Sequence, residues 1–315
     1  MFVQSINFIK NHQGNTKDVS IYGQELTATT YKLAKMNLAI RGISANLGEV
    51  PANSFFKDQH LDLKADYIMA NPPFNQKQWR DKNELTDDPR WTGFDVPPTG
   101  NANYAWIMHM LSKLSLDGTA GFVLANGAMS SNTSGEGKLR QMMIEKDLVD
   151  CMIALPGQLF YTTQIPVCLW FMTKNKKAVS AKKAGKGREK RNREGETLFI
   201  DARNMGTMIS RVLKELTTED LEKIAKTYHA WRGESKDGTY EDIAGFCKSA
   251  TLAEIQKNDF VLTPGRYVGI AEEEDDGIPF EKKMKGLSDT LFAQMKESGK
   301  LDVEIRNNLK VLGYE

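Results

Sequence analysis

Apolar residues recur along this chain in two kinds of pattern that alternate. Apolar positions three or four residues apart predict helices over residues 2–9, 27–40, 104–116, 137–146 and 218–231. Compact apolar runs bounded by polar turns predict strands over residues 18–22, 65–70, 118–125, 148–155, 167–173 and 198–201. Because strands and helices alternate, we expect an α/β sheet with helices on both of its faces.

The pattern changes in the last third of the chain. Residues 1–175 are expected to form the main domain, 176–196 a basic mobile loop, and 197–270 the end of the domain with a helical extension. Residues 271–315 are expected to form a helical tail that breaks into two amphipathic helices near Gly299. Its apolar stripe could pack on its own domain or on a partner. The stripe consists of Met284, Leu287, Leu291, Met295, Leu301, Ile305, Leu309 and Leu312.

Composition excludes several classes of protein. No apolar run reaches the roughly 18 residues that a membrane-spanning helix requires. The segment 1–12 lacks the features of a signal peptide. The three cysteines are scattered, and the four histidines have no acid or cysteine at ligand spacing, so neither a disulfide framework nor a metal site is expected. A prokaryotic cytoplasmic protein without membrane contact is the expectation.

The net charge of +1 hides one strongly basic segment. Between Lys174 and Arg193 there are ten Lys or Arg residues and a single acid, Glu189. Such a segment could follow DNA phosphates and add salt-dependent affinity. A solvated loop explains it equally well, because no aromatic residue interrupts the run. Candidate DNA contacts within it are Lys182, Lys183 and Arg188.

The strongest candidate for chemistry is Asn71-Pro72-Pro73-Phe74, directly after the predicted strand 65–70. The exocyclic amino group of adenine is a poor nucleophile, because its lone pair is delocalised into the ring. Two acceptors facing its two hydrogens, the Asn71 side-chain oxygen and the Pro72 carbonyl, would free that lone pair. Proline fixes φ and so holds this carbonyl in place. Phe74 offers a ring face for a stacked base.

A strand that ends in a proline-stiffened turn would explain the tripeptide Asn-Pro-Pro alone. The aromatic residue that follows it, and the buried strand that precedes it in an alternating α/β chain, favour the catalytic interpretation. The tetrad is similar to the catalytic motif of amino-group methyltransferases.

Longer stretches resemble one family within that group, the modification subunit of type I restriction-modification systems. The resemblance covers the chain from Met1 to about Gly269. It is carried by residues 22–25, 37–42, 65–75, 97–106, 155–166, 200–203 and 262–267.

This resemblance implies both a fold and a function. The fold would be a Rossmann-like methyltransferase sheet with a C-terminal helical extension. The activity would be methyl transfer from S-adenosylmethionine to the N6 amino group of adenine in DNA, without a metal. The implied partners are double-stranded DNA, a specificity subunit, a second modification subunit and a restriction subunit. Because methylation of a base in duplex DNA requires its extrusion, a site that holds a flipped adenine is expected.

The resemblance also implies roles for individual residues. Glu25 would bind the ribose hydroxyls of the cofactor, although an acid at a helix start explains it when taken alone. Asn53 stands where the family usually has an acid that holds the adenine amino group of the cofactor, and its amide oxygen can still accept that hydrogen bond. Asn71 would contact both cofactor and target base. Phe160 would help hold the target base, or serve as a structural aromatic.

The start of the chain departs from the family pattern. In the family, a strand and a glycine-rich turn immediately precede the helix that opens this chain. We therefore expect an N-terminally truncated protein that lacks the first strand and the glycine loop, with an unpaired sheet edge, low stability and weak cofactor binding on its own.

Two other functions remain open at this point. One is a catalytically inactive fragment that only binds a specificity subunit or DNA. The other is an amino-group methyltransferase that acts on RNA or on protein glutamine, since similar tetrads serve those substrates.

Overall fold

The computed structural model describes residues 1–179, 189–234, 238–270 and 279–314. The chain divides into two compact units, Met1–Ala271 and Glu272–Glu315. The first unit contains the sheet and all of its covering helices. The second contains the long helix α8 (Phe280–Val311).

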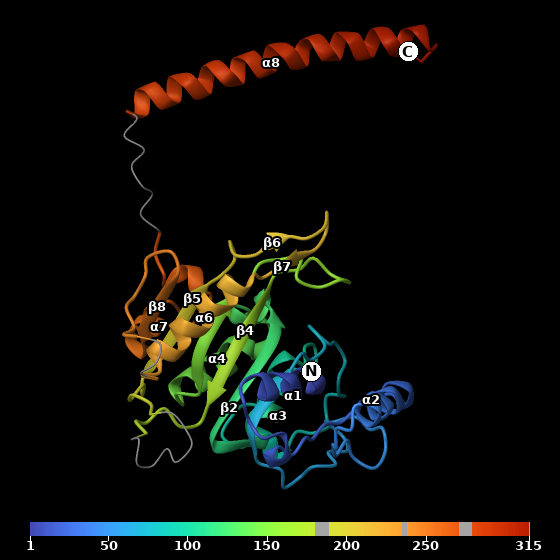
Figure 1. The fold of residues 1–315 in the computed structure, drawn as a ribbon, viewed down its shortest axis with the longest axis vertical. Coiled ribbons are helices and arrows are strands. Elements are labelled where there is room, and N and C mark those ends of the chain that lie inside the picture. Colours follow the sequence, from blue (N-terminus) through green and yellow to red (C-terminus); the bar gives the residue numbers. More distant parts are fainter. Residues whose placement is uncertain (180–188, 235–237, 271–278, 315) are drawn as a thin grey trace. The chain divides into compact units, whose positions relative to one another are not determined.

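One mixed sheet organises the described part of the first unit (Figure 1). Its six strands lie in the order β1-β2-β4-β3-β5-β8. β1 pairs with β2, and β3 with β5, in parallel, whereas β4 runs antiparallel to both β2 and β3. β1, β2, β3 and β5 therefore all point the same way. The strands are β1 (Ala65–Ala70), β2 (Leu114–Ala125), β3 (Val149–Ala154), β4 (Val167–Thr173), β5 (Glu196–Asp201) and β8 (Cys247–Thr251).

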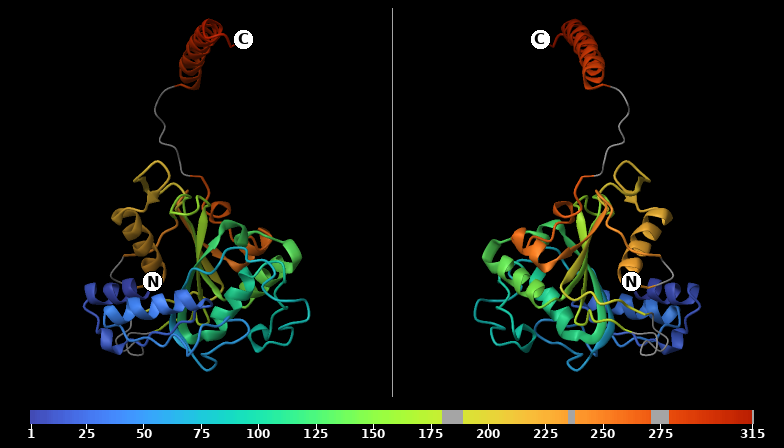
Figure 2. Two further views of the ribbon diagram at one scale, coloured as in Figure 1. Left: turned by 90° about the vertical axis from the view of Figure 1, so that its right-hand side faces the viewer. Right: turned by 90° about the vertical axis from the view of Figure 1, so that its left-hand side faces the viewer.

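Helices cover both faces of the sheet, which confirms the predicted α/β class (Figure 2). One face carries α3 (Asn103–Lys113), α4 (Glu136–Glu145) and α7 (Leu252–Lys257). The other face carries α1 (Phe2–Asn11) and α6 (Thr218–Trp231). α2 (Ala28–Ile40) packs against α1 through a small cluster around Tyr31 and Leu38.

Strand β4 shows why the core has two halves. Its side chains alternate between the faces, as the pleat of a strand requires. Trp170 and its neighbours at even positions pack with α3 and α4, while Phe171 and the odd positions pack with α6. Both flanking surfaces are covered, so the strand is a nearly continuous apolar run with the predicted bounds Val167–Thr173.

Local signals fix the start of the helix that covers the second face. Thr217 accepts a hydrogen bond from Asp220 N (3.1 Å), and the Asp220 carboxylate accepts one from Thr217 N (2.9 Å). This capping box satisfies donors that the first turn leaves free. It places α6 over Thr218–Trp231, as predicted.

The strand predicted over residues 65–70 is present as β1, but it is not buried: it lies at the edge of the sheet and exposes Tyr67 and Met69. Two further predictions about local structure were wrong, and one strand was missed. Residues 18–22 form no strand, because only Tyr22 makes a ladder contact, with Asn46. Strand β8 was not predicted, since it is short, polar and at a sheet edge. The tail is a single helix, α8, rather than two. A glycine inside a helix costs only about 1 kcal/mol, so Gly299 does not end it.

The long segment between Asn75 and Gly100 is packed rather than loose. Trp79 and Trp91 are buried, and the buried Arg80 guanidinium donates to four backbone carbonyls, of residues 81, 82, 84 and 97. Within the described ranges, no helix has the length and apolarity needed to cross a membrane.

Candidate functional site

The tetrad Asn71-Pro72-Pro73-Phe74 lies at the end of the sheet where the carboxyl ends of four parallel strands meet. β1 ends at Ala70, so Asn71 follows it directly. Since β2, β3 and β5 run in the same direction, their carboxyl ends at residues 125, 154 and 201 reach the same edge. Open α/β sheets bind their ligands beyond this edge.

Within the tetrad, buried and exposed positions alternate. Pro72 is buried, whereas Asn71 and Pro73 are exposed and Phe74 is half-buried. Among the described residues, none hydrogen-bonds the Asn71 side chain, so its amide oxygen is available to a ligand. The ring of the buried Pro72 fixes its own φ and so holds the backbone that carries the Pro72 carbonyl. Two acceptors therefore occur on consecutive residues at the strand end.

The structure brings Phe74 and Phe160 together, although 86 positions separate them. Their ring centroids lie 6.1 Å apart at an interplanar angle of 75°. This is an edge-to-face aromatic pair. Phe160 comes from the loop that joins the antiparallel strands β3 and β4, so this loop and the segment after β1 meet at the tetrad.

An asparagine cluster that the sequence did not single out holds the residue after the tetrad. Asn103 accepts from Asn75 N (3.0 Å), and its amide donates to Asn75 Oδ1 (2.9 Å). Asn101 also donates to Asn75 Oδ1, at 3.3 Å. Asn103 is only 1% exposed. A buried amide needs partners, so an asparagine at the start of an apolar helix was the signal that could have revealed this pair.

The tetrad segment and helix α3 are joined by two further bonds. Ala102 N donates to Gln76 O (2.9 Å), and Trp106 Nε1 donates to Gln76 Oε1 (3.3 Å). The loop that follows Phe74 is thus fixed to the first turn of α3.

The two candidate cofactor residues, Glu25 and Asn53, lie on neighbouring segments. Ala52 N donates to Glu25 O (2.9 Å), and Gln24 Nε2 donates to Ala52 O (3.0 Å). The Asn53 side chain accepts from Phe55 N (2.9 Å), which closes a local turn. The segment therefore presents Glu25 and Asn53 from adjacent stretches of backbone.

Arg90 connects the segment that follows Asn53 to helix α3. Its guanidinium donates to Ser54 O (2.9 Å) and Phe55 O (2.5 Å), and pairs with Asp88 at 2.6 Å. It also contacts His109 Nδ1 on α3, at 3.1 Å. Planar, bidentate donors suit such a junction.

The Glu25 carboxylate and the Asn53 amide oxygen are hydrogen-bond acceptors that fit the nucleoside half of S-adenosylmethionine. The Glu25 carboxylate is half-exposed and, among the described residues, accepts no hydrogen bond, so both oxygens are free for vicinal hydroxyls. The Asn53 oxygen uses one lone pair on Phe55 N and keeps a second. In the part of the chain that the structure describes, no cluster of His, Cys, Asp or Glu is arranged to hold a metal ion.

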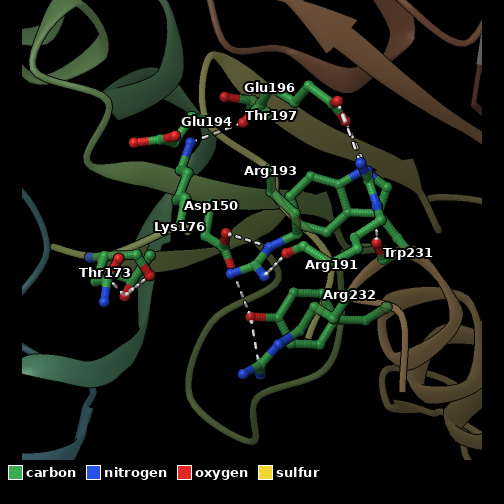
Figure 3. A network of polar contacts seen from close by, with 12 residues as sticks. Asp150, Thr173, Lys176, Arg191, Arg193, Glu194, Glu196, Thr197, Trp231 and Arg232 are labelled. Carbon is green, nitrogen blue, oxygen red and sulfur yellow. Dashed lines mark hydrogen bonds and ion pairs between the residues drawn. The ribbon is translucent and has the colours of Figure 1, made fainter. Parts of the chain in front are cut away.

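The basic segment is anchored at the opposite end of the sheet, where the parallel strands begin. Lys176 is buried, and its ammonium binds Asp147 Oδ1 (2.6 Å) and Val149 O (2.7 Å) at the amino end of β3. Arg193 binds Asp150 at 3.3 Å (Figure 3). Both ends of the segment thus lie away from Asn71. Lys182, Lys183 and Arg188 fall outside the described residues, and their contact with DNA stays a prediction.

Several known proteins resemble this chain over nearly its whole length. Residues 1–276 match the family model described as N-6 DNA Methylase. The chain is 54% identical over 314 residues to the type I restriction enzyme HindI methylase subunit of Haemophilus influenzae. It is 40% identical over 318 residues to the MjaIX methylase subunit of Methanocaldococcus jannaschii. It covers 66% and 54% of the lengths of these two relatives, which is less than two thirds of either.

A solved structure is similar as well. The type I restriction-modification methyltransferase subunit from Streptococcus thermophilus matches with a TM-score of 0.66 and 27% identity. The match covers 79% of this chain and 48% of that one. The expected methyltransferase type of α/β sheet is thereby confirmed.

Proposed function

Because this chain belongs to the N-6 DNA Methylase family, we propose that it methylates the N6 amino group of adenine in DNA as the modification subunit of a type I restriction-modification system. The observation that carries the proposal is the tetrad Asn71–Phe74 at the carboxyl edge of four parallel strands, with the ring of Phe160 against that of Phe74.

The amino group of the target adenine is activated by acceptors rather than by a base. The Asn71 amide oxygen and the Pro72 carbonyl each accept one of its two hydrogens, and the nitrogen moves toward tetrahedral geometry. When bound, S-adenosylmethionine would supply a methyl group from its sulfonium centre, leaving as a neutral thioether. As the N–C bond forms, the positive charge passes to N6, where the preorganised acceptors stabilise it. The methylated nitrogen is then a strong acid that releases one of its two protons to water, so no charged general base has to remove a proton before transfer.

The aromatic pair holds the target base outside the duplex. Extrusion costs a few kcal/mol of stacking and pairing. Stacking on an aromatic face stabilises the extruded base by about 1–3 kcal/mol. The Phe74 ring supplies such a face, and Phe160 supports it from the side. The buried Pro72 keeps this face at a fixed distance from the acceptors.

The cofactor is S-adenosylmethionine, held at its nucleoside half by the segment that carries Glu25 and Asn53. Glu25 accepts from the two ribose hydroxyls, and the Asn53 oxygen accepts from the adenine amino group. Asn71 contributes at the boundary between the cofactor and the target base.

The partners proposed for this chain are double-stranded DNA and a specificity subunit that reads the sequence. A second modification subunit and a restriction subunit complete the assembly. Helix α8 is proposed as the contact with the specificity subunit, because apolar residues at helical spacing, among them Leu287, Leu291 and Met295, run along it.

Transfer of a labelled methyl group from S-adenosylmethionine to DNA tests the proposal. The chain is assembled with its specificity subunit, and Asn71→Ala is compared with Asn11→Ala, an exposed asparagine on α1. We expect a loss of at least about 100-fold for Asn71→Ala, the size seen when a transition-state hydrogen-bond group is removed, and no change for Asn11→Ala. Labelling of protein or RNA in place of DNA would overturn the substrate assignment.

A further inference from the structure

Two segments rise together from the carboxyl edge of the sheet, beside the tetrad. One is the loop 158–165 between β3 and β4, and the other is the hairpin 207–215 formed by β6 (Thr207–Met208) and β7 (Lys214–Glu215). Lys214 N donates to Gln158 O (2.8 Å), so a hydrogen bond joins the two segments. The hairpin is labelled β6 and β7 in Figure 1. We call the two segments together the rim.

The base of the rim is firmly built. Leu159, Phe160, Met205 and Leu216 pack against the core cluster shared with α6. The Asp220 carboxylate accepts from Gly206 N (2.9 Å), so the capping box of α6 also fixes the hairpin. Gly206 has φ +84, and a Cβ there would lie 2.8 Å from Glu215 O, so only glycine allows this turn.

The tips of the rim, in contrast, present large apolar side chains to solvent. Tyr161 is 91% exposed, and the others are half-exposed. Five apolar side chains exposed on two segments that are hydrogen-bonded to each other are typical of a binding surface rather than of solvated loops. The exposed members are Tyr161, Ile165, Met208, Ile209 and Val212.

Position and charge favour nucleic acid as the occupant. Tyr161 directly follows Phe160, whose ring contacts Phe74, so the apolar tips continue the surface that faces the target base. The loop 158–165 contains no charged residue, and the hairpin contains Arg211 and Lys214 against one acid, Glu215. Apolar side chains flanked by basic ones match a duplex, in which stacked bases lie between phosphates.

We propose that the rim is a wedge that enters the duplex beside the target adenine. Its apolar tips take the place of the extruded base against the neighbouring base pairs, while Arg211 and Lys214 bind phosphates. Proteins that distort DNA use apolar wedges of this kind to offset the cost of unstacking. The inference rests on the proposed function and adds the surface that makes the base accessible.

The test compares a matched duplex with one that carries a mismatch at the target adenine. The recognition sequence is first read from the methylated adenines of the host genome. Ile209→Ser/Val212→Ser and Tyr161→Ser are assembled with the specificity subunit. Leu116→Ser, an equally apolar exposed residue at the opposite end of β2, is the control. A mismatched base is extruded at lower cost, so the wedge matters less there.

We expect kcat/KM on the matched duplex to fall about 10- to 100-fold in the rim variants, equivalent to the few kcal/mol of one unstacking step, and to recover on the mismatched duplex. The control should match the unsubstituted protein on both. Equal losses on both duplexes would overturn the wedge. Loss of the specificity subunit on gel filtration would instead identify the rim as a protein interface.

A second readout separates this inference from the proposed function. With 2-aminopurine at the target position, extrusion raises fluorescence without any methyl transfer. If the unsubstituted protein transfers no methyl group, the proposed function fails. A fluorescence increase that the rim variants lose would still support the wedge, and an increase that they retain would overturn it.

Discussion

Asn103 and Asn75 hydrogen-bond each other in both directions, with Asn75 N donating to Asn103 Oδ1 at 3.0 Å and Asn103 Nδ2 donating to Asn75 Oδ1 at 2.9 Å. Asn75 has a positive φ of 52°, a conformation that asparagine tolerates better than most residues. The pair therefore fixes the backbone turn directly after Phe74. Through it, the buried first turn of α3 sets the position of the tetrad.

Replacing Asn103 by Asp should lower methyl transfer far more than replacing Asn75 by Asp. Asn103→Asp leaves an acceptor facing the Asn75 side-chain oxygen, so the turn is released. We expect kcat for methyl transfer to fall by about 100-fold, as a misplacement of roughly 1 Å can cause, with cofactor affinity unchanged. Asn75→Asp keeps its acceptor and should retain most activity. Equal kcat values for the two variants would rule out this positioning role.

Substitutions of Glu25 and Asn53 should change cofactor affinity to different extents. Glu25→Gln loses one acceptor for the ribose and should weaken S-adenosylmethionine binding about 10- to 100-fold, the value of one hydrogen bond to a charged group. Asn53→Asp retains the acceptor for Phe55 N and should bind as well or better, whereas Asn53→Ala should bind more weakly. Calorimetric titration measures all three. Unaltered affinity in Glu25→Gln would remove this residue from the cofactor site.

These sites show what the sequence could and could not predict. The position of the tetrad was predictable, because Asn-Pro-Pro-Phe directly follows an apolar run that predicts a strand. The prediction that this strand is buried was wrong, because β1 lies at the edge of the sheet. The partnership of Phe74 with Phe160 required the family resemblance, since nothing local links residues so far apart. The Asn75–Asn103 pair escaped prediction because a hydrogen bond between a loop and a distant helix leaves no periodic signal. Strand β8 escaped because edge pairing with β5, rather than its own composition, makes it a strand.

A buried polar network beneath α6 should dominate stability at the other edge of the sheet (Figure 3). Asp150 is 1% exposed and binds both Arg193 and the hydroxyl of Tyr228, the latter at 2.7 Å. Burial and the Asp150 carboxylate raise the pKa of Tyr228 well above its usual value, so the phenol stays a donor.

Asp150→Ala should lower the free energy of unfolding by about 3–5 kcal/mol, because it leaves the buried Arg193 without its partner. Tyr228→Phe removes a single bond to a charged group and should cost about 1.5–3 kcal/mol. Urea unfolding measures both, with Tyr161→Phe as the exposed control. A loss below about 1 kcal/mol for Asp150→Ala would show that Arg193 finds another partner.

His109 should make the fold sensitive to mild acid. Burial, aided by the Arg90 guanidinium, lowers the pKa of His109 from 6.5 to about 4. The unfolded chain therefore takes up a proton below pH 6.5 that the folded chain takes up only near pH 4. Stability falls as the pH drops through this window, by about 3 kcal/mol for the difference between the two pKa values.

The carboxylates near His109 do not mask this effect. The pKa values of Asp58 and Asp88 lie below 3.8, so their contributions are lost at lower pH than that of His109. His109→Gln should flatten the melting temperature between pH 6.5 and 4, whereas the exposed His12→Gln should not. An unchanged acid dependence in His109→Gln would assign the loss to other groups.

Helix α8 should owe its order to a partner. Its 32 residues include Gly286 and Gly299, each of which costs about 1 kcal/mol in a helix interior, and its apolar stripe includes Leu287 and Leu291. Most helical stability in proteins comes from packing of an apolar face.

Leu287→Asp/Leu291→Asp interrupts that face and should abolish co-purification with the specificity subunit. The change Lys282→Asp/Lys285→Asp introduces the same number of acids without removing an apolar residue, and should preserve the complex. Retention of the subunit by the leucine variant would exclude the apolar stripe as the contact, and loss in both variants would point to charge rather than apolar packing.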